Sequence, residues 1–254
     1  MLDMNRSIDL NADVGEGCGD DAALLPLVTS CNIACGAHAG DAATMRRTIE
    51  LALRHGVRIG AHPGYADRAN FGRVVVPLEP SAITALVAAQ IADLASIASA
   101  CGATLQHVKP HGALYNLAAS DPAVAQAVAQ AVASLDPRLI LVGLAESALP
   151  AAGVALGLSV AHEAFVDRAY QADGTLRPRS LPGAVHRDPA QAIGQALALA
   201  TDEPFAAYTG QPLRRRADTL CIHGDTPQAM VFAQALRTTL HSAGIALAAP
   251  NLQR

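Results

Sequence analysis

The chain has 254 residues, enough for one large domain, and 51% of them are hydrophobic although only 3% are aromatic. Its formal net charge of −4 gives no support for a nucleic-acid partner or an anionic membrane surface. We expect no secretory signal, and we expect the apolar stretches to be too short to cross a bilayer; the five cysteines show no CxxC spacing. We therefore expect one soluble, cytoplasmic domain over residues 1–254 with reduced thiols.

Short β-type runs alternate with alanine-rich helical runs along the whole chain. The expected strands are Ser7–Asp13, Ser30–Gly36, Val57–His62, Thr104–Pro110, Leu139–Leu144, Ser159–Val166 and Thr219–His223. The expected helices lie near Ala42–His55, Ser81–Ala100, Pro122–Leu135, Glu146–Ala155, Pro189–Leu199 and Pro227–Ala243. Common end signals support them: Ser81 as an N-cap, Pro122 and Pro189 in first turns, and Gly56, Gly102 and Gly244 past the ends.

Repeated βα units imply a parallel sheet, which is either a closed barrel or an open, doubly wound sheet. An open sheet gathers its ligand at one switch point, whereas a barrel places functional residues at the C-terminal ends of many strands. At least five of the expected strands end in polar residues next to glycine. This pattern favours a β/α barrel.

Alternation along the expected strands sorts their side chains into two faces. In the first strand, Asp9, Asn11 and Asp13 share the face that we expect to look into the barrel. Residues on one face of each later strand form further groups. These groups are Asn32 and His38; Arg58, Gly60 and His62; His107, Lys109 and His111; and Cys221 and His223. The fifth strand, Leu139–Leu144, is wholly apolar, and we interpret it as purely structural.

Four histidines close to glycine fall at expected strand ends: His38, His62, His111 and His223. Their convergence on one rim with Asp13 and Lys109 predicts a functional site, because burying so many polar groups without a ligand or solvent is costly. Lys109 is the only lysine, against seventeen arginines. A compact ammonium retained at a strand end indicates a specific task, such as binding an oxyanion.

Several familiar sites are missing from the sequence. It contains no GxxxxGK[ST] phosphate-binding loop, no HExxH zinc motif and no GxSxG nucleophile elbow. The segment Gly15–Gly19 is glycine-rich without dinucleotide-binding spacing, and we interpret it as a mobile loop. The basic run Arg214–Arg216 is interpreted as a solvated loop.

Motif blocks along nearly the whole chain resemble the LamB/YcsF family of 5-oxoprolinase components. The blocks include Asp9–Glu16, Asn32–Asp41, Gly60–Gly64, Asp67–Arg68, Asn70–Arg73, Val108–Asn116, Glu163–Arg168, Tyr170–Gly174, Pro178–Arg179 and His223–Asp225. Segment 200–216 matches no motif of the family. The resemblance implies a distorted, seven-stranded β/α barrel of the glycoside hydrolase/deacetylase type.

The resemblance also implies an activity, the ATP-dependent opening of 5-oxo-L-proline (pyroglutamate) to L-glutamate, with two partner subunits, PxpB and PxpC. ATP, with Mg2+, is then a cosubstrate. The absence of a phosphate-binding loop is consistent with two arrangements: a partner subunit handles ATP, or this barrel binds phosphate without that motif. A lactam is a stable amide with a poor leaving group, so phosphorylation of its oxygen provides the activation that water attack needs.

Within this scheme the rim residues receive hypothetical roles. Asp13 positions or deprotonates the water, Lys109 stabilises negative charge, and His111 or His62 carries a proton. Arg73 or Arg179 holds the substrate carboxylate. The remaining expected substrate-binding residues are Asn11, Glu16, Asn32, His38, Tyr115 and His223. His107 lies deeper, where a structural role suffices.

Two other interpretations stay open. A metal-dependent amidase or deacetylase would need no ATP, and if a tightly bound metal is present its ligands would be Asp13, His38, His62 and His111. A scaffold for a kinase-like partner would need no convergent histidines.

Overall fold

Seven parallel strands close into a barrel in the computed structural model, which describes residues 6–222 and 229–250. The barrel strands are β1 (Ser7–Val14), β2 (Ser30–Ala34), β3 (Arg58–His62), β4 (His107–Val108), β5 (Ile140–Leu144), β6 (Val160–Phe165) and β9 (Thr219–Ile222). Neighbours in this order pair in parallel, and β9 pairs with both β6 and β1 to complete the ring. The expected seven-stranded barrel is confirmed, and the open sheet is excluded.

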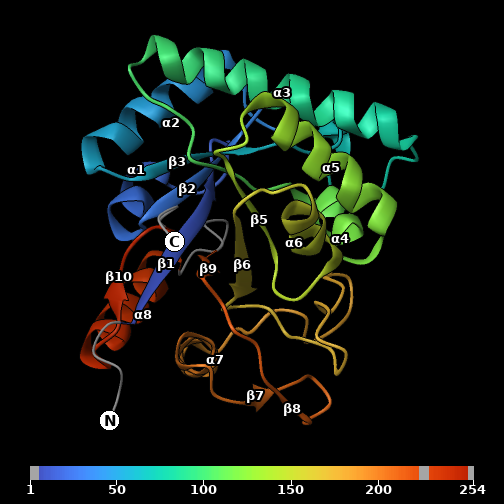
Figure 1. Ribbon diagram of the computed structural model, residues 1–254. Helices are drawn as coiled ribbons and strands as arrows, with labels where there is room; N and C mark the ends of the chain where they lie inside the picture. The colour runs from blue at the N-terminus through green and yellow to red at the C-terminus, as the bar shows by residue number, and fades with distance from the viewer. Residues whose placement is uncertain (1–5, 223–228, 251–254) are drawn as a thin grey trace.

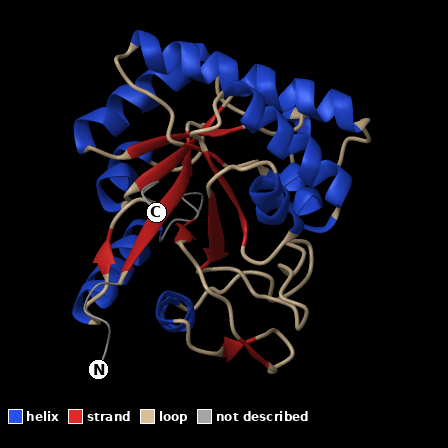
Figure 2. Cartoon of the chain, viewed as in Figure 1, coloured by secondary structure: helices blue, strands red, loops and turns tan. Residues whose placement is uncertain are grey.

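Helices surround the strands, which occupy the centre of the molecule (Figure 2). They are α1 (Asp21–Leu24), α2 (Ala42–His55), α3 (Pro80–Ala100), α4 (Gly112–Ser120), α5 (Pro122–Leu135), α6 (Ala148–Ala155), α7 (Pro189–Thr201) and α8 (Ala229–Ser242), with short 3-10 turns η1 (Leu25–Leu27) and η2 (Arg68–Asn70). The strand β10 (Ala246–Leu247) pairs with the start of β1. Figure 1 shows α3 and α5 along one side of the barrel and α7 on the opposite side.

The expectation that every apolar stretch is too short to cross a bilayer is wrong for α3, which is long and apolar enough by length and composition alone. Its large apolar side chains Ile83, Val87, Ile91 and Leu94 are buried, and it packs on α2, α5 and β3. The exposed positions are mostly alanine and serine. Its hydropathy therefore reflects its role as a covering helix of the barrel.

Several element ends differ from the sequence-based expectation. The prediction of Ser81 as the N-cap is wrong, since α3 begins at Pro80 and its N-cap is Glu79. Proline is tolerated there because the first turn of a helix does not use the backbone N–H that proline lacks. The helix expected from Glu146 begins at Ala148, since Glu146 has a left-handed backbone with φ 60°. The last helix is described only from Ala229, so Pro227 lies outside the described residues.

Two regions contain structure that the sequence did not predict. The helix α4 begins at Gly112, directly after Pro110 and His111, and residues 200–216 contain a hairpin of β7 (Phe205–Ala206) and β8 (Pro212–Leu213). The run Arg214–Arg216 was expected to be solvated. This is confirmed for Arg214 and wrong for Arg215, whose guanidinium forms an ion pair with Glu146.

The expected inward face of β1 is confirmed, and Asp9 occupies its deepest part. The Asp9 carboxylate accepts hydrogen bonds from Thr29 (2.5 Å), Ser30 (2.8 Å) and Thr219 (2.5 Å). Higher in the barrel, Gly60 has no room for a side chain, because a Cβ there would overlap the ring of His107. Polar groups therefore fill the interior from the Asp9 end to the rim.

Burial raises the pKa of Asp9 to about 6, from an ordinary value of 3.8. Below about pH 4 the Asp9 carboxyl is protonated in both the folded and the unfolded chain. Above about pH 6 the folded chain carries a buried charge at Asp9, so the free energy of unfolding falls as the pH rises. Replacing Asp9 with asparagine (Asp9→Asn) should remove this fall in the free energy of unfolding. The unfolding free energy of the variant relative to wild type should rise by up to about 3 kcal/mol between pH 4 and pH 7.

Chemical denaturation at a series of pH values measures this difference. The exposed Asp93→Asn variant is the matched control and should show no such trend. A difference for Asp9→Asn that stays flat across the range would contradict the assignment.

Candidate active site

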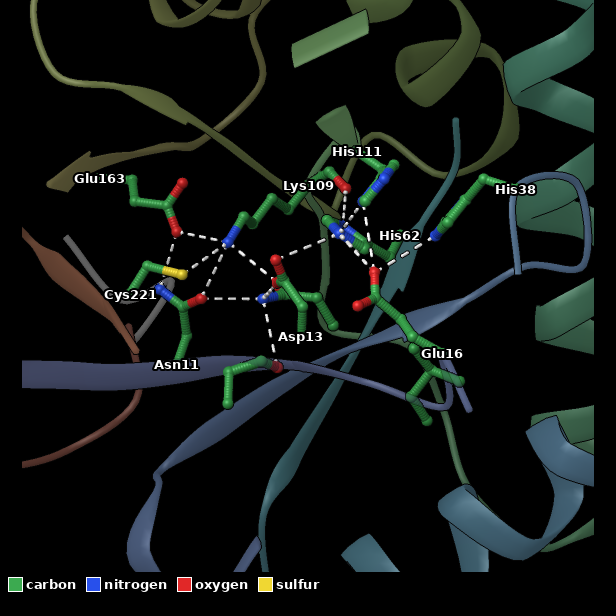
Figure 3. A network of polar contacts seen from close by, with 12 residues as sticks. Asn11, Asp13, Glu16, His38, His62, Lys109, His111, Glu163 and Cys221 are labelled. Atoms are coloured by element: carbon green, nitrogen blue, oxygen red, sulfur yellow. Dashed lines mark hydrogen bonds and ion pairs between the residues drawn. The ribbon is translucent and has the colours of Figure 1, made fainter. Parts of the chain in front are cut away.

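Lys109 follows β4 directly and extends its ammonium group into the barrel interior (Figure 3). Its Nζ lies 2.8 Å from Glu163 Oε1, 3.0 Å from Asp13 Oδ1, 3.2 Å from Asn11 Oδ1 and 3.2 Å from Cys221 Sγ. Lys109 is only 2% exposed. Two carboxylates from β1 and β6 thus enclose one buried cation.

The surrounding charges keep Lys109 protonated. Burial lowers the pKa of a lysine, but the negative charges of Asp13 and Glu163 outweigh this effect and raise the pKa of Lys109 well above its usual range. Lys109 is therefore a permanent ammonium group, suited to holding negative charge and unsuited to accepting a proton at neutral pH.

A layer of amides holds the carboxylates in place. Asn11 Nδ2 donates to Glu163 Oε1 (2.9 Å), and Asn32 Nδ2 donates to Asp13 Oδ1 (2.9 Å). His107 Nε2 donates to Asn32 Oδ1 (2.8 Å), and burial lowers the pKa of His107 to about 3. The deep position expected for His107 is confirmed, and its hydrogen bond orients Asn32.

Three imidazoles surround Glu16 beside this lysine network (Figure 3). Glu16 Oε1 lies 3.3 Å from His111 Nδ1, 3.4 Å from His38 Nε2 and 3.9 Å from His62 Nε2. The rings of His38 and His111 stack with their centroids 3.8 Å apart. Asp13 Oδ2, 3.3 Å from His62 Nε2, connects the two groups.

Glycines make this dense packing possible. A Cβ at Gly64 would come within 2.9 Å of His38 Nδ1, and one at Gly72 within 2.8 Å of His38 Cβ and 3.0 Å of His111 Cδ2. Gly72 also has φ +61°, which L side chains rarely adopt. The segment Gly60–Gly72 thus shapes the space in which the two stacked rings lie.

The histidines differ in protonation because their surroundings differ. Burial lowers the pKa of His38 and of His111 to about 3, so both are neutral. Burial also lowers the pKa of His62, but the Asp13 carboxylate more than offsets it and the net shift is upward. Burial, followed by the charge of Asp13, raises the pKa of Glu16.

A cavity of about 530 Å³ opens above these groups. The expected site residues that line it are Asp13, Glu16, His62, Arg73, Lys109, His111, Tyr115 and Arg179. Leu144 lines it as well, so the interpretation of the fifth strand as purely structural is wrong. Its volume falls within the range of about 300–1,000 Å³ typical of small-molecule sites.

Three expected substrate-binding residues lie outside the cavity lining. Asn11 and Asn32 are buried beneath it, where they position Glu163 and Asp13, and His38 is covered by the stacked His111. His223 lies outside the described residues.

Glu163 is the main residue to which the sequence assigned no role. It is fully buried on β6 and contacts Lys109 more closely than Asp13 does. Its signal was the single acidic residue of the strand Val160–Phe165, on the face that also carries Phe165. From the irregular segment 166–188 the sequence named only Arg179 as a site residue, but Arg168, Thr175, Leu176, Pro178 and Ser180 also line the cavity. Buried Arg168 holds this segment by donating to the carbonyls of Ala184 and Arg177.

Comparisons with known proteins agree on one family. The model of the LamB/YcsF family matches residues 8–253. The A subunit of 5-oxoprolinase from Chloroflexus aggregans is 53% identical over 96% of this chain and 99% of its own length. The protein of the same name from Bordetella pertussis is 51% identical over 97% of this chain and 100% of its own.

A solved structure resembles the fold closely. The lactam utilization protein from Thermus thermophilus superposes with a TM-score of 0.90 at 42% identity, covering 96% of this chain and all of the other. The chain therefore belongs to the LamB/YcsF family.

The buried ion pair generates a stability prediction. Lys109→Met should lower the free energy of unfolding by about 3–5 kcal/mol, because it leaves buried carboxylates without a counter-charge. Combining it with Glu163→Gln should cost less than the two single changes added together, by more than about 1 kcal/mol. Urea denaturation of the wild type, the two single variants and the double variant measures this coupling energy between Lys109 and Glu163.

The exposed pair Arg138–Asp136, whose atoms lie 2.9 Å apart, is the matched control. A cycle of Arg138→Met and Asp136→Asn should give a coupling below about 1 kcal/mol. Additive effects of Lys109→Met and Glu163→Gln would show that the buried contact contributes no specific energy.

Proposed function

We propose that this chain is one component of a cytoplasmic, ATP-dependent 5-oxoprolinase that opens 5-oxo-L-proline to L-glutamate, working with the partner subunits PxpB and PxpC. The names of its relatives, which refer to 5-oxoprolinase and to lactam utilization, support this substrate class. The observation that carries the proposal is the Asp13–Lys109–Glu163 group at a cavity that Arg73 and Arg179 also line.

The chemistry of a lactam explains the coupling to ATP. Transfer of the γ-phosphoryl group to the amide oxygen gives ADP and an imidate-like carbon that water can attack. Water adds to that carbon, and the C–N bond breaks as the ring nitrogen takes up a proton and leaves as an amine. The resulting acyl phosphate is hydrolysed by a second water to glutamate and phosphate.

Asp13 is the best placed base for the water attack. It lines the cavity, and its two oxygens contact Lys109 and His62 (3.0 and 3.3 Å). The Lys109 ammonium group contacts Asp13 and places positive charge beneath the position where negative charge develops. The sequence offered His62 and His111 as proton carriers. The raised pKa of His62 favours it for this role, and the low pKa of His111 disfavours His111.

The positively charged part of the cavity suits the substrate carboxylate and the phosphate. Arg73 and Arg179 line the cavity, and the Arg73 guanidinium lies 4.9 Å from the ring centre of Phe71. Arginine binds carboxylate and phosphate oxygens through two parallel hydrogen bonds. We assign the recognition of these anionic groups to Arg73 and Arg179.

Reconstitution tests the proposed reaction. This chain, 5-oxoproline and ATP with Mg2+ should form glutamate and ADP only when PxpB and PxpC are both present. Glutamate and ADP are followed separately, with each partner omitted in turn. Glutamate formation by this chain alone without ATP would contradict the proposal.

A second prediction concerns Asp13 in the complete complex. Asp13→Asn should lower kcat by about 10²–10⁴, because the carboxylate is lost as a base, with a much smaller change in KM. Asp93→Asn, on the exposed face of α3, should retain wild-type kcat. Full activity of Asp13→Asn would exclude the proposed role and would leave a scaffold function for this chain.

The histidine cluster around Glu16 favours one competing function, a metal-dependent amidase that needs no ATP. Such an enzyme would open the lactam without nucleotide, and its turnover would track bound metal and stop with a chelator. The same reconstitution, run without ATP and with added Zn2+, separates the two functions.

A further inference from the structure

The atoms around Glu16 have the spacing of a metal coordination sphere. Four potential ligand atoms, one each from Glu16, His38, His62 and His111, all lie within 4.8 Å of one another. Tetrahedral coordination with metal–ligand bonds of about 2.0–2.1 Å places neighbouring ligand atoms about 3.4 Å apart. The contacts of Glu16 Oε1 at 3.3, 3.4 and 3.9 Å, and that of His62 Nε2 with His111 Nδ1 at 3.0 Å, are close to this value.

Backbone hydrogen bonds orient two of the imidazoles for this purpose. His62 Nδ1 lies 2.7 Å from the Lys109 carbonyl, and His111 Nε2 lies 2.8 Å from the Phe71 carbonyl. A carbonyl only accepts, so both of these nitrogens donate. Metal-binding histidines commonly donate their second ring N–H in this way, which directs the other nitrogen at the metal.

The remaining atoms face one another as acceptors. His111 Nδ1, the ring nitrogen that does not donate to the Phe71 carbonyl, lies 3.0 Å from His62 Nε2 and 3.3 Å from Glu16 Oε1, so lone pairs converge on one point. Such an arrangement is repulsive unless a cation lies among the lone pairs. A proton on His62 Nε2 can relieve one of these contacts, but it cannot serve all of the converging atoms.

His38 is the second, independent observation. It is 1% exposed, and neither of its ring nitrogens has a hydrogen-bond partner within residues 6–222 and 229–250. Glu16 Oε1 is buried and also lacks a hydrogen-bond partner there. Polar atoms buried in this way are costly and call for a ligand. A proton shared between His62 and Asp13 leaves His38 unexplained.

We propose that Glu16, His38, His62 and His111 bind one divalent transition-metal ion of the zinc class. Imidazole nitrogens with one carboxylate suit zinc and its neighbours better than Mg2+, which prefers oxygen ligands. Glu16 replaces Asp13 in the ligand set expected from the sequence, because Glu16 Oε1 contacts all three imidazoles. The Asp13 carboxylate is engaged by Asn32, Lys109 and His62.

This site goes beyond the proposed function. With an ion in place, His62 and His111 are ligands, and the proton-carrying role given above to His62 passes to Asp13. Because Glu16, His62 and His111 line the cavity, the ion would face the bound substrate as a positive charge beside Asp13.

The test uses the purified full-length chain without ATP, 5-oxoproline or partners, so its outcome is independent of the ring-opening proposal. The chain is stripped with a chelator and titrated with Zn2+ by calorimetry, and its metal content is measured by mass spectrometry after dialysis. We expect one ion per chain, a higher Tm with Zn2+, and a visible Co2+ spectrum of the intensity that tetrahedral coordination gives.

Glu16→Gln and His38→Gln should each weaken Zn2+ binding by about 100-fold or more. The matched controls Glu50→Gln and His55→Gln, both exposed on α2, should bind as wild type does. Circular dichroism checks that each variant is folded, and the wild-type titration stands even if one variant is not. Absence of stoichiometric binding by the wild-type chain, or wild-type affinity in folded Glu16→Gln and His38→Gln, would overturn the proposal.

Discussion

The buried ammonium group of Lys109 is the constraint on which the arrangement of the barrel interior depends. A cation that is only 2% exposed is tolerated because two carboxylates contact it, Asp13 from β1 and Glu163 from β6, two strands that both pair with β9. These carboxylates need hydrogen-bond donors of their own, which Asn11 and Asn32 supply. These contacts join Lys109, Asp13, Glu163, Asn11 and Asn32 into one connected polar network.

The barrel brings these residues together because its strands are parallel and their side chains alternate. Asp13 pairs in register with Asn32, which pairs with Gly60, which pairs with His107. At Gly60 the missing side chain leaves the space that the ring of His107 occupies. Residues far apart in the chain therefore meet at one level of the barrel, and small residues decide where the large polar ones fit.

Much of this could be predicted from the sequence, and the failures have physical causes. Alternation placed Asp13, Lys109 and His111 on inward faces, because parallel strands in a barrel leave no other arrangement. It could not show that Asn11 and Asn32 stop short of the cavity, since depth depends on strand register. Glu163 was missed because one acidic residue in a strand has no periodic pattern. Glu16 was expected to bind substrate, but its contact with three imidazoles could not be predicted, because it lies in a loop, where only tertiary contacts fix the side chain.

The rim contains two polar groups that differ in one respect. Around Lys109 the protein supplies both signs of charge, so carboxylates of the chain itself balance the ammonium group. Around Glu16 the described chain supplies mainly acceptors: one carboxylate and three imidazoles, two of which are neutral because burial lowers their pKa to about 3. Asp13 contacts both groups, so a cation bound at Glu16 would act on the same carboxylate that Lys109 holds. Lys109 and such a cation would place two positive charges beside Asp13, which would favour the ionised form that its proposed role as a base requires.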